Sequence, residues 1–139
     1  MQIEVFSLCD AATDTAGKLN ILGAFDMMLV SKIPAVYPQC AVALRIRFER
    51  IERAEHKVQV HFVDKDGRNV IPPLESQMKV HFIDEQRSVS VNMILNIHGL
   101  RIDRAGEYSI DLAIDGQQKS SLPLFVKERP KVDMAGPKV

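Results

Sequence analysis

Apolar and polar side chains alternate with a period of two along most of this chain. Such alternation places successive side chains on opposite faces of an extended strand and does not match the period of a helix. In the clearest run one face carries Cys40, Val42, Leu44, Ile46 and Phe48, and the other carries Ala41, Ala43, Arg45, Arg47 and Glu49. This run predicts a half-buried antiparallel strand.

Further runs extend the pattern along the chain. Alternation covers residues 58–62, 78–82, 89–97 and 108–114, and an apolar run covers 122–126. Asp115-Gly116 opens a turn between the last two runs, and Asp66-Gly67 marks another turn. Residues 3–8 and 19–30 are apolar on both faces in places, which predicts central strands covered on both sides. Gly23 predicts a bulge or bend within the second of these segments.

The sequence lacks the apolar stripe of an amphipathic helix. The nearest candidate, Glu49–His56, is short and charged, and we expect it to form a loop or a single turn. Prolines mark connectors, and segments 34–38 and 71–74 are expected to cross between two sheets. These features predict an all-β fold, an antiparallel β-sandwich of about eight strands, rather than an up-and-down barrel. The predicted core consists of Val42, Leu44, Ile46, Phe48, Val60, Phe62, Val91, Met93, Leu95, Ile110 and Leu112.

Length and charge limit the number of domains and the class of partner. The chain has 139 residues, 46% of them hydrophobic, which fits one domain with its own core. We expect a sandwich over residues 1–128 and a C-terminal arm over 129–139. Eighteen basic and eighteen acidic residues give a formal net charge of zero, which argues against nucleic acid or an anionic membrane as a partner. The N-terminal residues carry neither a basic segment nor a long apolar run, so we expect a cytoplasmic protein.

Both cysteines, Cys9 and Cys40, adjoin apolar strand segments. In a reducing compartment such residues are expected to stay reduced and to be buried as small hydrophobic side chains. A Cys9–Cys40 disulfide is the alternative. A catalytic thiol is disfavoured, because no local nucleophile signature surrounds either cysteine.

The segment 103–110, with the turn that follows it, resembles the closing hairpin of immunoglobulin-like domains. In that family a tyrosine enters the penultimate strand and its hydroxyl bonds back to the backbone as a tyrosine corner. Tyr108 matches the tyrosine and Gly106 matches the small residue before it, whereas Arg104 and Ile110 replace the family's aspartate and cysteine. The resemblance implies an immunoglobulin-like sandwich in which Tyr108 is buried, and it implies no activity.

Four other segments resemble a narrower family. Leu8–Asp14, Gly17–Asp26, Pro34–Cys40 and Arg45–Phe48 are similar to a family of small bacterial proteins grouped only as a domain of unknown function. The resemblance implies a stand-alone bacterial cytoplasmic protein without an established activity. It therefore carries no functional residue over to this chain.

A repeated pattern places a histidine in each of two predicted strands, as Val60-His61-Phe62 and Val80-His81-Phe82. If the strands paired in register, His61 and His81 would offer two imidazoles to one metal ion. No cysteine or carboxylate at ligand spacing completes a set on these segments. An exposed polar face is therefore favoured over a metal site.

Aspartates gather in two other places. Asp64-Lys65-Asp66-Gly67 resembles the start of a calcium loop but lacks the later ligands, so we expect a hairpin turn. Asp10, Asp14 and Asp26 invite an interpretation as catalytic carboxylates. Aspartates beside Ala, Thr and Gly in a connector are more often turn formers that bond their own backbone, and we favour that interpretation.

The arginines at positions 45, 47, 50 and 53 are candidates for an anion patch. Because the glutamates at positions 49, 52 and 55 interleave with them, a solvated charged face is favoured. The sequence has no glycine-rich phosphate loop and no His-Glu-x-x-His motif. We therefore assign no catalytic, cofactor-binding or metal-ligating residue and expect no cofactor.

Two functional hypotheses follow. The first is a non-catalytic sandwich that binds a protein partner or itself, most simply as a homodimer, with the arm at 129–139 and its apolar Val132, Met134 and Val139 in the contact. The alternative is an enzyme or small-ligand binder with a site in loops at one end of the sandwich, around Asp10–Lys18 and Pro34–Gln39. Converging polar side chains would favour the alternative, and an apolar patch would favour the first hypothesis.

Overall fold

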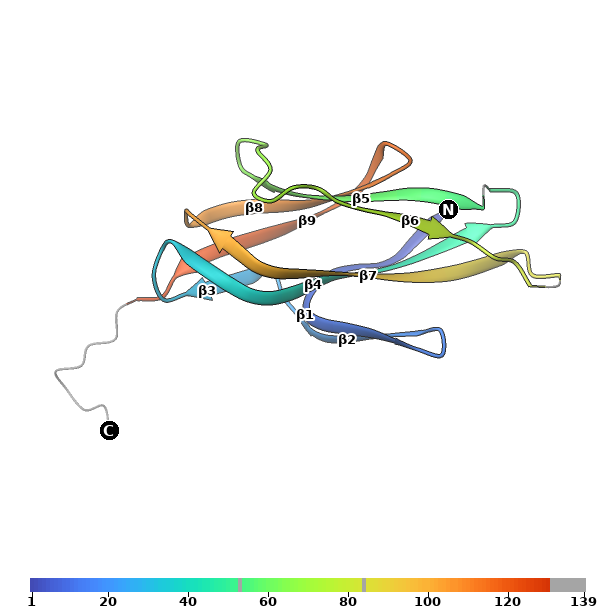
Figure 1. Ribbon diagram of the computed structural model, residues 1–139, viewed down its shortest axis with the longest axis horizontal. Coiled ribbons are helices and arrows are strands. Elements are labelled where there is room, and N and C mark those ends of the chain that lie inside the picture. Colours follow the sequence, from blue (N-terminus) through green and yellow to red (C-terminus); the bar gives the residue numbers. More distant parts are fainter. Residues whose placement is uncertain (53, 84, 131–139) are drawn as a thin grey trace.

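The structure is a computed structural model that describes residues 1–52, 54–83 and 85–130. The described residues form nine strands in two sheets that lie face to face along the long axis of the molecule (Figure 1). None of the described residues is helical. The predicted all-β fold and two-sheet sandwich are therefore confirmed, with one strand more than the alternation indicated.

The four-stranded sheet has the order β2-β1-β4-β7 and is antiparallel throughout. Its strands are β1 (Gln2–Thr15), β2 (Lys18–Ala24), β4 (Ala35–Glu49) and β7 (Ser88–Ile102). β4 pairs with β7 along its whole length, from Ala35 opposite Ile102 to Glu49 opposite Ser88. The clearest alternating run of the sequence thus forms an interior strand of this sheet.

The five-stranded sheet has the order β3-β9-β8-β5-β6. Its strands are β3 (Met27–Val30), β5 (Glu55–Asp64), β6 (Leu74–Lys79), β8 (Gly106–Ile114) and β9 (Gln117–Glu128). β3 runs parallel to β9, with Met27 opposite Phe125 and Val30 opposite Glu128. The predicted antiparallel sandwich thus has one parallel pairing, at this edge, which the sequence did not indicate.

The apolar character of segment 19–30 predicted a central strand. This prediction is wrong. The segment splits at Phe25 and Asp26 into β2 and β3, which are edge strands of different sheets. Gly23 lies in β2 with a φ of +67°, and a Cβ there would lie 2.5 Å from Oδ2 of Asp10. The pairing of β2 with β1 continues in register past Gly23, so this glycine marks a bend rather than a bulge.

Several predicted connectors differ from the structure. Residues 31–34 lead from one sheet to the other, but Ala35–Gln39 belong to β4 and pair with β7. Segment 71–74 does not cross between sheets, because it joins β5 to its neighbour β6. The run at 78–82 is a strand only as far as Lys79, and the predicted loop at 49–56 shortens to the residues between Glu49 and Glu55.

The core lies between the two sheets and contains most of the predicted residues. Residues 42, 44, 46, 48, 60, 62, 110 and 112 are buried as predicted. Val91, Met93 and Leu95 pack against this core but are only partly buried. They lie on β7, which is an edge strand and so has a neighbour on one side alone.

A second, smaller hydrophobic cluster lies outside the sandwich core. Ala41 and Ala43, which the alternation placed on the solvent face of β4, are fully buried together with Cys9. Partly buried Ala12, Leu19 and Ile94 pack against them. The distal half of β1 and the strand β2 form a hairpin, whose tip contacts β4 and β7 through Arg45 and Asn92. This hairpin shields the outward alanines.

Candidate functional site

The two cysteines lie on opposite faces of one sheet. Cys9 is directly opposite Ala41, so its side chain shares a face with Ala41 while Cys40 faces the sandwich core. Both are free and fully buried, as predicted, and this arrangement excludes a disulfide between them. Burial raises the pKa of both thiols, that of Cys40 to about 11, so neither is a ready nucleophile.

His61 and His81 do not meet. β5 and β6 are antiparallel, with Val60 opposite Leu74 and Glu55 opposite Lys79. His61 therefore lies beyond one end of the pairing and His81 beyond the other. Within the described ranges there is also no group of three His, Cys, Asp or Glu side chains that could hold a metal ion.

The three N-terminal aspartates lie at different places in the fold. Asp14 is a turn former, as predicted, because its Oδ1 accepts a hydrogen bond from Gly17 N at 3.0 Å. Its Oδ2 also accepts from Asn92 Nδ2 at 2.9 Å. Asp10 lies four residues before Asp14 in the same strand, and Asp26 lies immediately before β3. The hydrogen bonds of Asp14 thus go to the turn and to Asn92 rather than to a second carboxyl group.

The arginines of β4 bind a glutamate that the sequence analysis did not pair with them. Arg45 Nε lies 3.1 Å from one carboxylate oxygen of Glu4, and Arg47 Nε lies 3.0 Å from the other. Arg50 donates to the backbone oxygen of Gln86 at 2.9 Å. Arg53 lies outside the described residues. The expectation of a neutralised charged face holds, although Glu4 rather than the interleaved glutamates pairs with Arg45 and Arg47.

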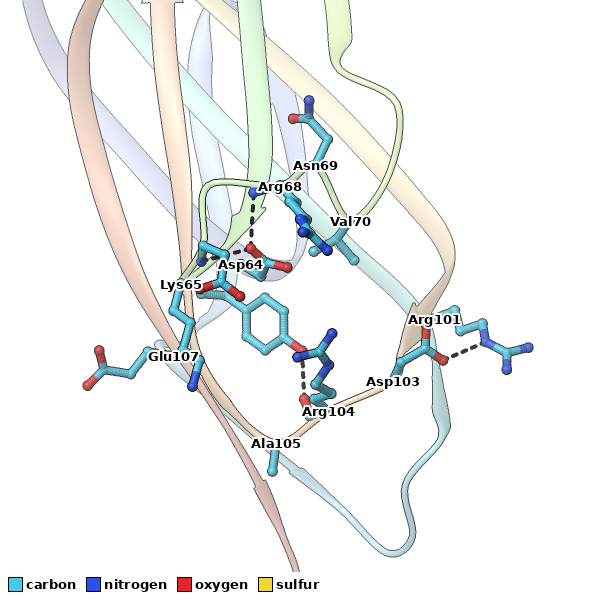
Figure 2. Close-up of a pocket in the computed structure, with 12 residues that line it drawn as sticks. Asp64, Lys65, Arg68, Asn69, Val70, Arg101, Asp103, Arg104, Ala105 and Glu107 are labelled. Carbon is cyan, nitrogen blue, oxygen red and sulfur yellow. Dashed lines mark hydrogen bonds and ion pairs between the residues drawn. The ribbon is translucent and has the colours of Figure 1, made fainter.

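A pocket of about 260 Å³ lies where the β5–β6 loop meets the β7–β8 turn (Figure 2). Its walls come from segments 64–70 and 101–108, and Tyr108 contacts the backbone of Arg104. The pocket is at one end of the sandwich, as the loop-site hypothesis required. It is built from other loops, because Asp10–Thr15 and Ala35–Gln39 belong to strands.

Asp64 organises the loop on one side of the pocket. Its Oδ1 accepts hydrogen bonds from the backbone N–H groups of Asp66 at 2.9 Å and Arg68 at 3.0 Å. The bond from Arg68 is the main reason why the pKa of Asp64 lies below its usual value. Asp64-Lys65-Asp66-Gly67 is thus the predicted hairpin turn, held by its first aspartate.

Tyr108 organises the other side. It is 9% exposed, and its hydroxyl donates a hydrogen bond of 2.6 Å to the backbone oxygen of Arg104. Burial is the main cause of the raised pKa of this phenol. The burial and the backbone bond predicted for Tyr108 are both confirmed, and together they hold the β7–β8 turn in place.

The pocket lining carries equal numbers of cationic and anionic side chains. The cations are Lys65, Arg68, Arg101 and Arg104, and the anions are Asp64, Asp66, Asp103 and Glu107. Arg101 and Asp103 form an ion pair of 2.8 Å on the rim, where both are well exposed. The lining thus combines charges that already compensate one another.

A different kind of site lies at the edge of the five-stranded sheet. Among the described residues β3 pairs with β9 alone, so its other edge is open. Met28 and Val30 face the core, whereas Met27 and Leu29 are 41% and 50% exposed. A shallow groove of about 440 Å³ lies at the residues that precede β3, and it is lined by Phe6, Ser7, Leu8, Ala24, Phe25, Asp26, Leu122 and Pro123.

The sequence profile of a family described as "Family of unknown function (DUF6941)" matches residues 4–127. The chain belongs to this family. No curated protein matches it. Among solved structures, an alkylpurine DNA glycosylase from Pseudomonas fluorescens, AlkC, bound to DNA containing an abasic site analog, is similar at 8% identity and a TM-score of 0.41. The similarity covers 88% of this chain but 30% of the glycosylase chain.

This DUF6941 member also contains a buried histidine that the sequence analysis missed. His56 Nδ1 lies 2.7 Å from Asp115 Oδ2, and the His56 ring stacks on Phe48 with centroids 4.4 Å apart. Asp115 Oδ1 accepts from Lys57 N at 3.0 Å, so the contact ties the start of β5 to the β8–β9 turn. The signal was present in the alternation, because His56 has the parity of Val58 and Val60 on the buried face of β5.

The described residues of this DUF6941 member include no helix long and apolar enough to cross a membrane. In the same part of the chain, two features remain as candidate sites. One is the pocket at the sandwich end, and the other is the open edge of β3.

Proposed function

We propose that this protein acts by association rather than by catalysis, and that it pairs with a strand of a protein partner along the open edge of β3. The observation that carries the proposal is an unpaired strand edge flanked by two exposed apolar side chains, Met27 and Leu29. An open edge presents backbone donors and acceptors that template pairing with another strand. The zero net charge supports a protein partner over nucleic acid or an anionic membrane.

The other edge strands are less suited to this role. β7 carries Ser88, Ser90 and Asn92 on its outward face, and these side chains bond to Arg47, Glu4 and Asp14 of the same chain. β6 carries the exposed charges of Glu75 and Lys79. β2 exposes Leu22, at 69%, but the polar side chains of Lys18 and Asn20 lie on the same face of the strand. Charges and polar groups along an edge discourage pairing.

The test is a lysine placed at the centre of the open edge. We expect Leu29→Lys to weaken self-association and capture of proteins from native lysate, because a charge on an edge opposes pairing. Leu22→Lys is the matched control, since Leu22 is an exposed leucine on the edge of the other sheet, and it should leave both readouts unchanged. Equal behaviour of Leu29→Lys, Leu22→Lys and the unsubstituted protein in both assays would overturn the proposal.

A second candidate function is the binding of a small anion in the end pocket. Arg68 and Arg104 both lower the pKa of Asp64 by their charge, yet neither forms an ion pair within the described part of the chain. Their guanidinium groups are the groups that would bind a phosphate or carboxylate ligand, in competition with the four carboxylates of the same lining. Titration with inorganic phosphate, followed by two-dimensional NMR, should shift the amide signals of residues 64–70 and 103–108. An Arg104→Gln variant should lose these shifts, and their absence from the unsubstituted protein would exclude this function.

A further inference from the structure

We infer that the partner at the open edge of β3 is a second copy of this chain. In this arrangement β3 lies antiparallel to β3 of the other copy, with the two-fold axis at Leu29. The inference rests on the proposed function and adds the identity of the occupant and the register of pairing. Two-fold pairing of one strand with itself is an isologous contact, which closes at the dimer.

The backbone of β3 has the alternation that this register needs. Asp26 O accepts from Phe125 N at 2.8 Å, and Val30 O accepts from Arg129 N at 2.7 Å. Because the backbone groups of a strand alternate between its two edges, residues 26, 28 and 30 face β9, and Met27 and Leu29 direct their N–H and C=O groups to the open edge. Two copies of Leu29 placed opposite each other can therefore exchange both N–H···O=C bonds as a hydrogen-bonded pair.

The side chains agree with the same register. Residues directly opposite in an antiparallel pair share a face of the sheet. Leu29 would lie beside Leu29 of the other copy on the outer face, covering side chains that are half exposed in the single chain. Met28 would lie opposite Val30 on the core face, where both are already buried. The two five-stranded sheets would then continue across the dimer as one.

Charge complementarity distinguishes this register from others. Asp26 and Lys32 flank β3, three residues on either side of Leu29, so in this register Asp26 of one copy would approach Lys32 of the other at each end of the paired segment. Both residues are exposed, and neither forms an ion pair within the described residues. Because of the two-fold symmetry, the dimer would contain this Asp26–Lys32 pair twice. A register centred on Met27 would instead place Asp26 opposite Met28 and leave both charges without a partner.

The contact is small, because β3 has four residues. Interfaces of this size are expected to be weak, and complementary charges within them contribute orientation and register more than affinity. We therefore expect a dimer that forms at high protein concentration and weakens as salt is added.

The experiment exchanges the two charges. Asp26→Lys places lysines at both 26 and 32, and Lys32→Asp places aspartates at both, so each variant alone would set like charges opposite each other twice. Sedimentation equilibrium should show the dissociation constant of each variant to be about tenfold higher or more. A one-to-one mixture should form a heterodimer with two attractive pairs, and the double variant Asp26→Lys/Lys32→Asp should recover the unsubstituted dissociation constant.

Controls separate this inference from the proposed function. Urea midpoints of all variants should match that of the unsubstituted protein, because both positions are exposed. A monomer at high concentration, single variants that dimerise normally, or a mixture without recovery would each overturn the self-pairing. If self-pairing failed but the unsubstituted protein still captured lysate proteins and Leu29→Lys did not, the proposed function would stand. The partner at β3 would then be a different protein. If Leu29→Lys changed nothing, the proposed function itself would fail.

Discussion

Glu4 holds together the polar outer face of the four-stranded sheet. Its carboxylate accepts from Ser90 Oγ at 2.6 Å and pairs with Arg45 and Arg47, so one β1 residue contacts both β4 and β7. The bond from Ser90, followed by that from Arg47, lowers the pKa of Glu4 below its ordinary value of 4.5. Protonation of this carboxylate would weaken contacts between three strands.

The lowered pKa of Glu4 predicts a pH dependence of stability. A carboxyl whose pKa is lower in the folded state stabilises the fold above its unfolded pKa and loses this contribution as the pH falls through the folded pKa. We expect the free energy of unfolding of the unsubstituted protein to decline as the pH falls below about 4.5, and that of Glu4→Gln to decline less steeply. Urea titrations at several pH values measure this, and parallel declines would show that Glu4 contributes little.

Tyr108 gives a second prediction for a single residue. Tyr108→Phe removes the hydroxyl that donates to Arg104 O and leaves the packed ring, whose centroid lies 5.8 Å from that of Phe62. We expect the free energy of unfolding to fall by about 1 kcal/mol, the usual contribution of one hydrogen bond. Denaturant unfolding measures the change. A variant as stable as the unsubstituted protein would mean that water replaces the bond at no cost.

Among the strands, β4 is the element on which both hydrophobic clusters depend. Leu44 is fully buried on its core face. We expect Leu44→Ala to lower the free energy of unfolding by about 2 to 5 kcal/mol, through lost burial and the cavity that remains. Met93→Ala is the comparison, because Met93 is directly opposite Leu44 but only partly buried, and it should cost less. Urea unfolding of both variants tests the ranking.

The opposite face of β4 gives a sharper prediction. Ala43 is fully buried beneath the β1–β2 hairpin, so a larger side chain has no space there. We expect Ala43→Leu to lower the free energy of unfolding by about 1 to 3 kcal/mol through overpacking. If Ala43 faced solvent, as the alternation alone indicates, the same substitution would change stability by less than about 0.5 kcal/mol. Thermal or urea unfolding separates the two cases.

These differences show what alternation along a strand can and cannot predict. It assigned Leu44 and Leu112 to the core, because side-chain parity follows directly from extended backbone geometry. It did not place Val91 on an edge strand or Ala43 under a hairpin, since both depend on which strands become neighbours. The small side chains at 41 and 43, together with the apolar Ile94 on the otherwise polar face of residues 88–98, were the available signal for a covered outer face.

The candidate sites were harder to predict for the same reason. Proline and aspartate content directed attention to Asp10–Lys18 and Pro34–Gln39, but long pairings with β2 and β7 extend the strands through most of these segments. The end pocket instead joins loops about forty residues apart in the sequence, at Asp64 and Arg104. The open edge of β3 depends on a parallel pairing that no local pattern predicts.

For the molecule as a whole, removal of the C-terminal residues tests folding and self-association separately. β9 ends at Glu128, and residues 131–139 of the predicted arm, with Val132, Met134 and Val139, lie outside the described residues. We expect a chain lacking 129–139 to keep the sandwich, because that truncation removes the bond from Arg129 N to Val30 O but no strand residue. Far-ultraviolet circular dichroism should be unchanged, and sedimentation should show that self-association through β3 is retained, because β3 and β9 are complete in the truncated chain. Weaker self-association would show that residues 129–139 also take part in the contact.

The parallel pairing of β3 with β9 also constrains how the protein is made. β3 is among the first strands to leave the ribosome, yet its neighbour in the sheet is the last of the nine strands to be synthesised. Until then Met28 and Val30 have no β9 beside them, and closing so long a loop is slow relative to forming local hairpins. A nascent chain therefore carries an incomplete sheet until β9 has been synthesised, and apolar side chains exposed in such incomplete folds favour aggregation.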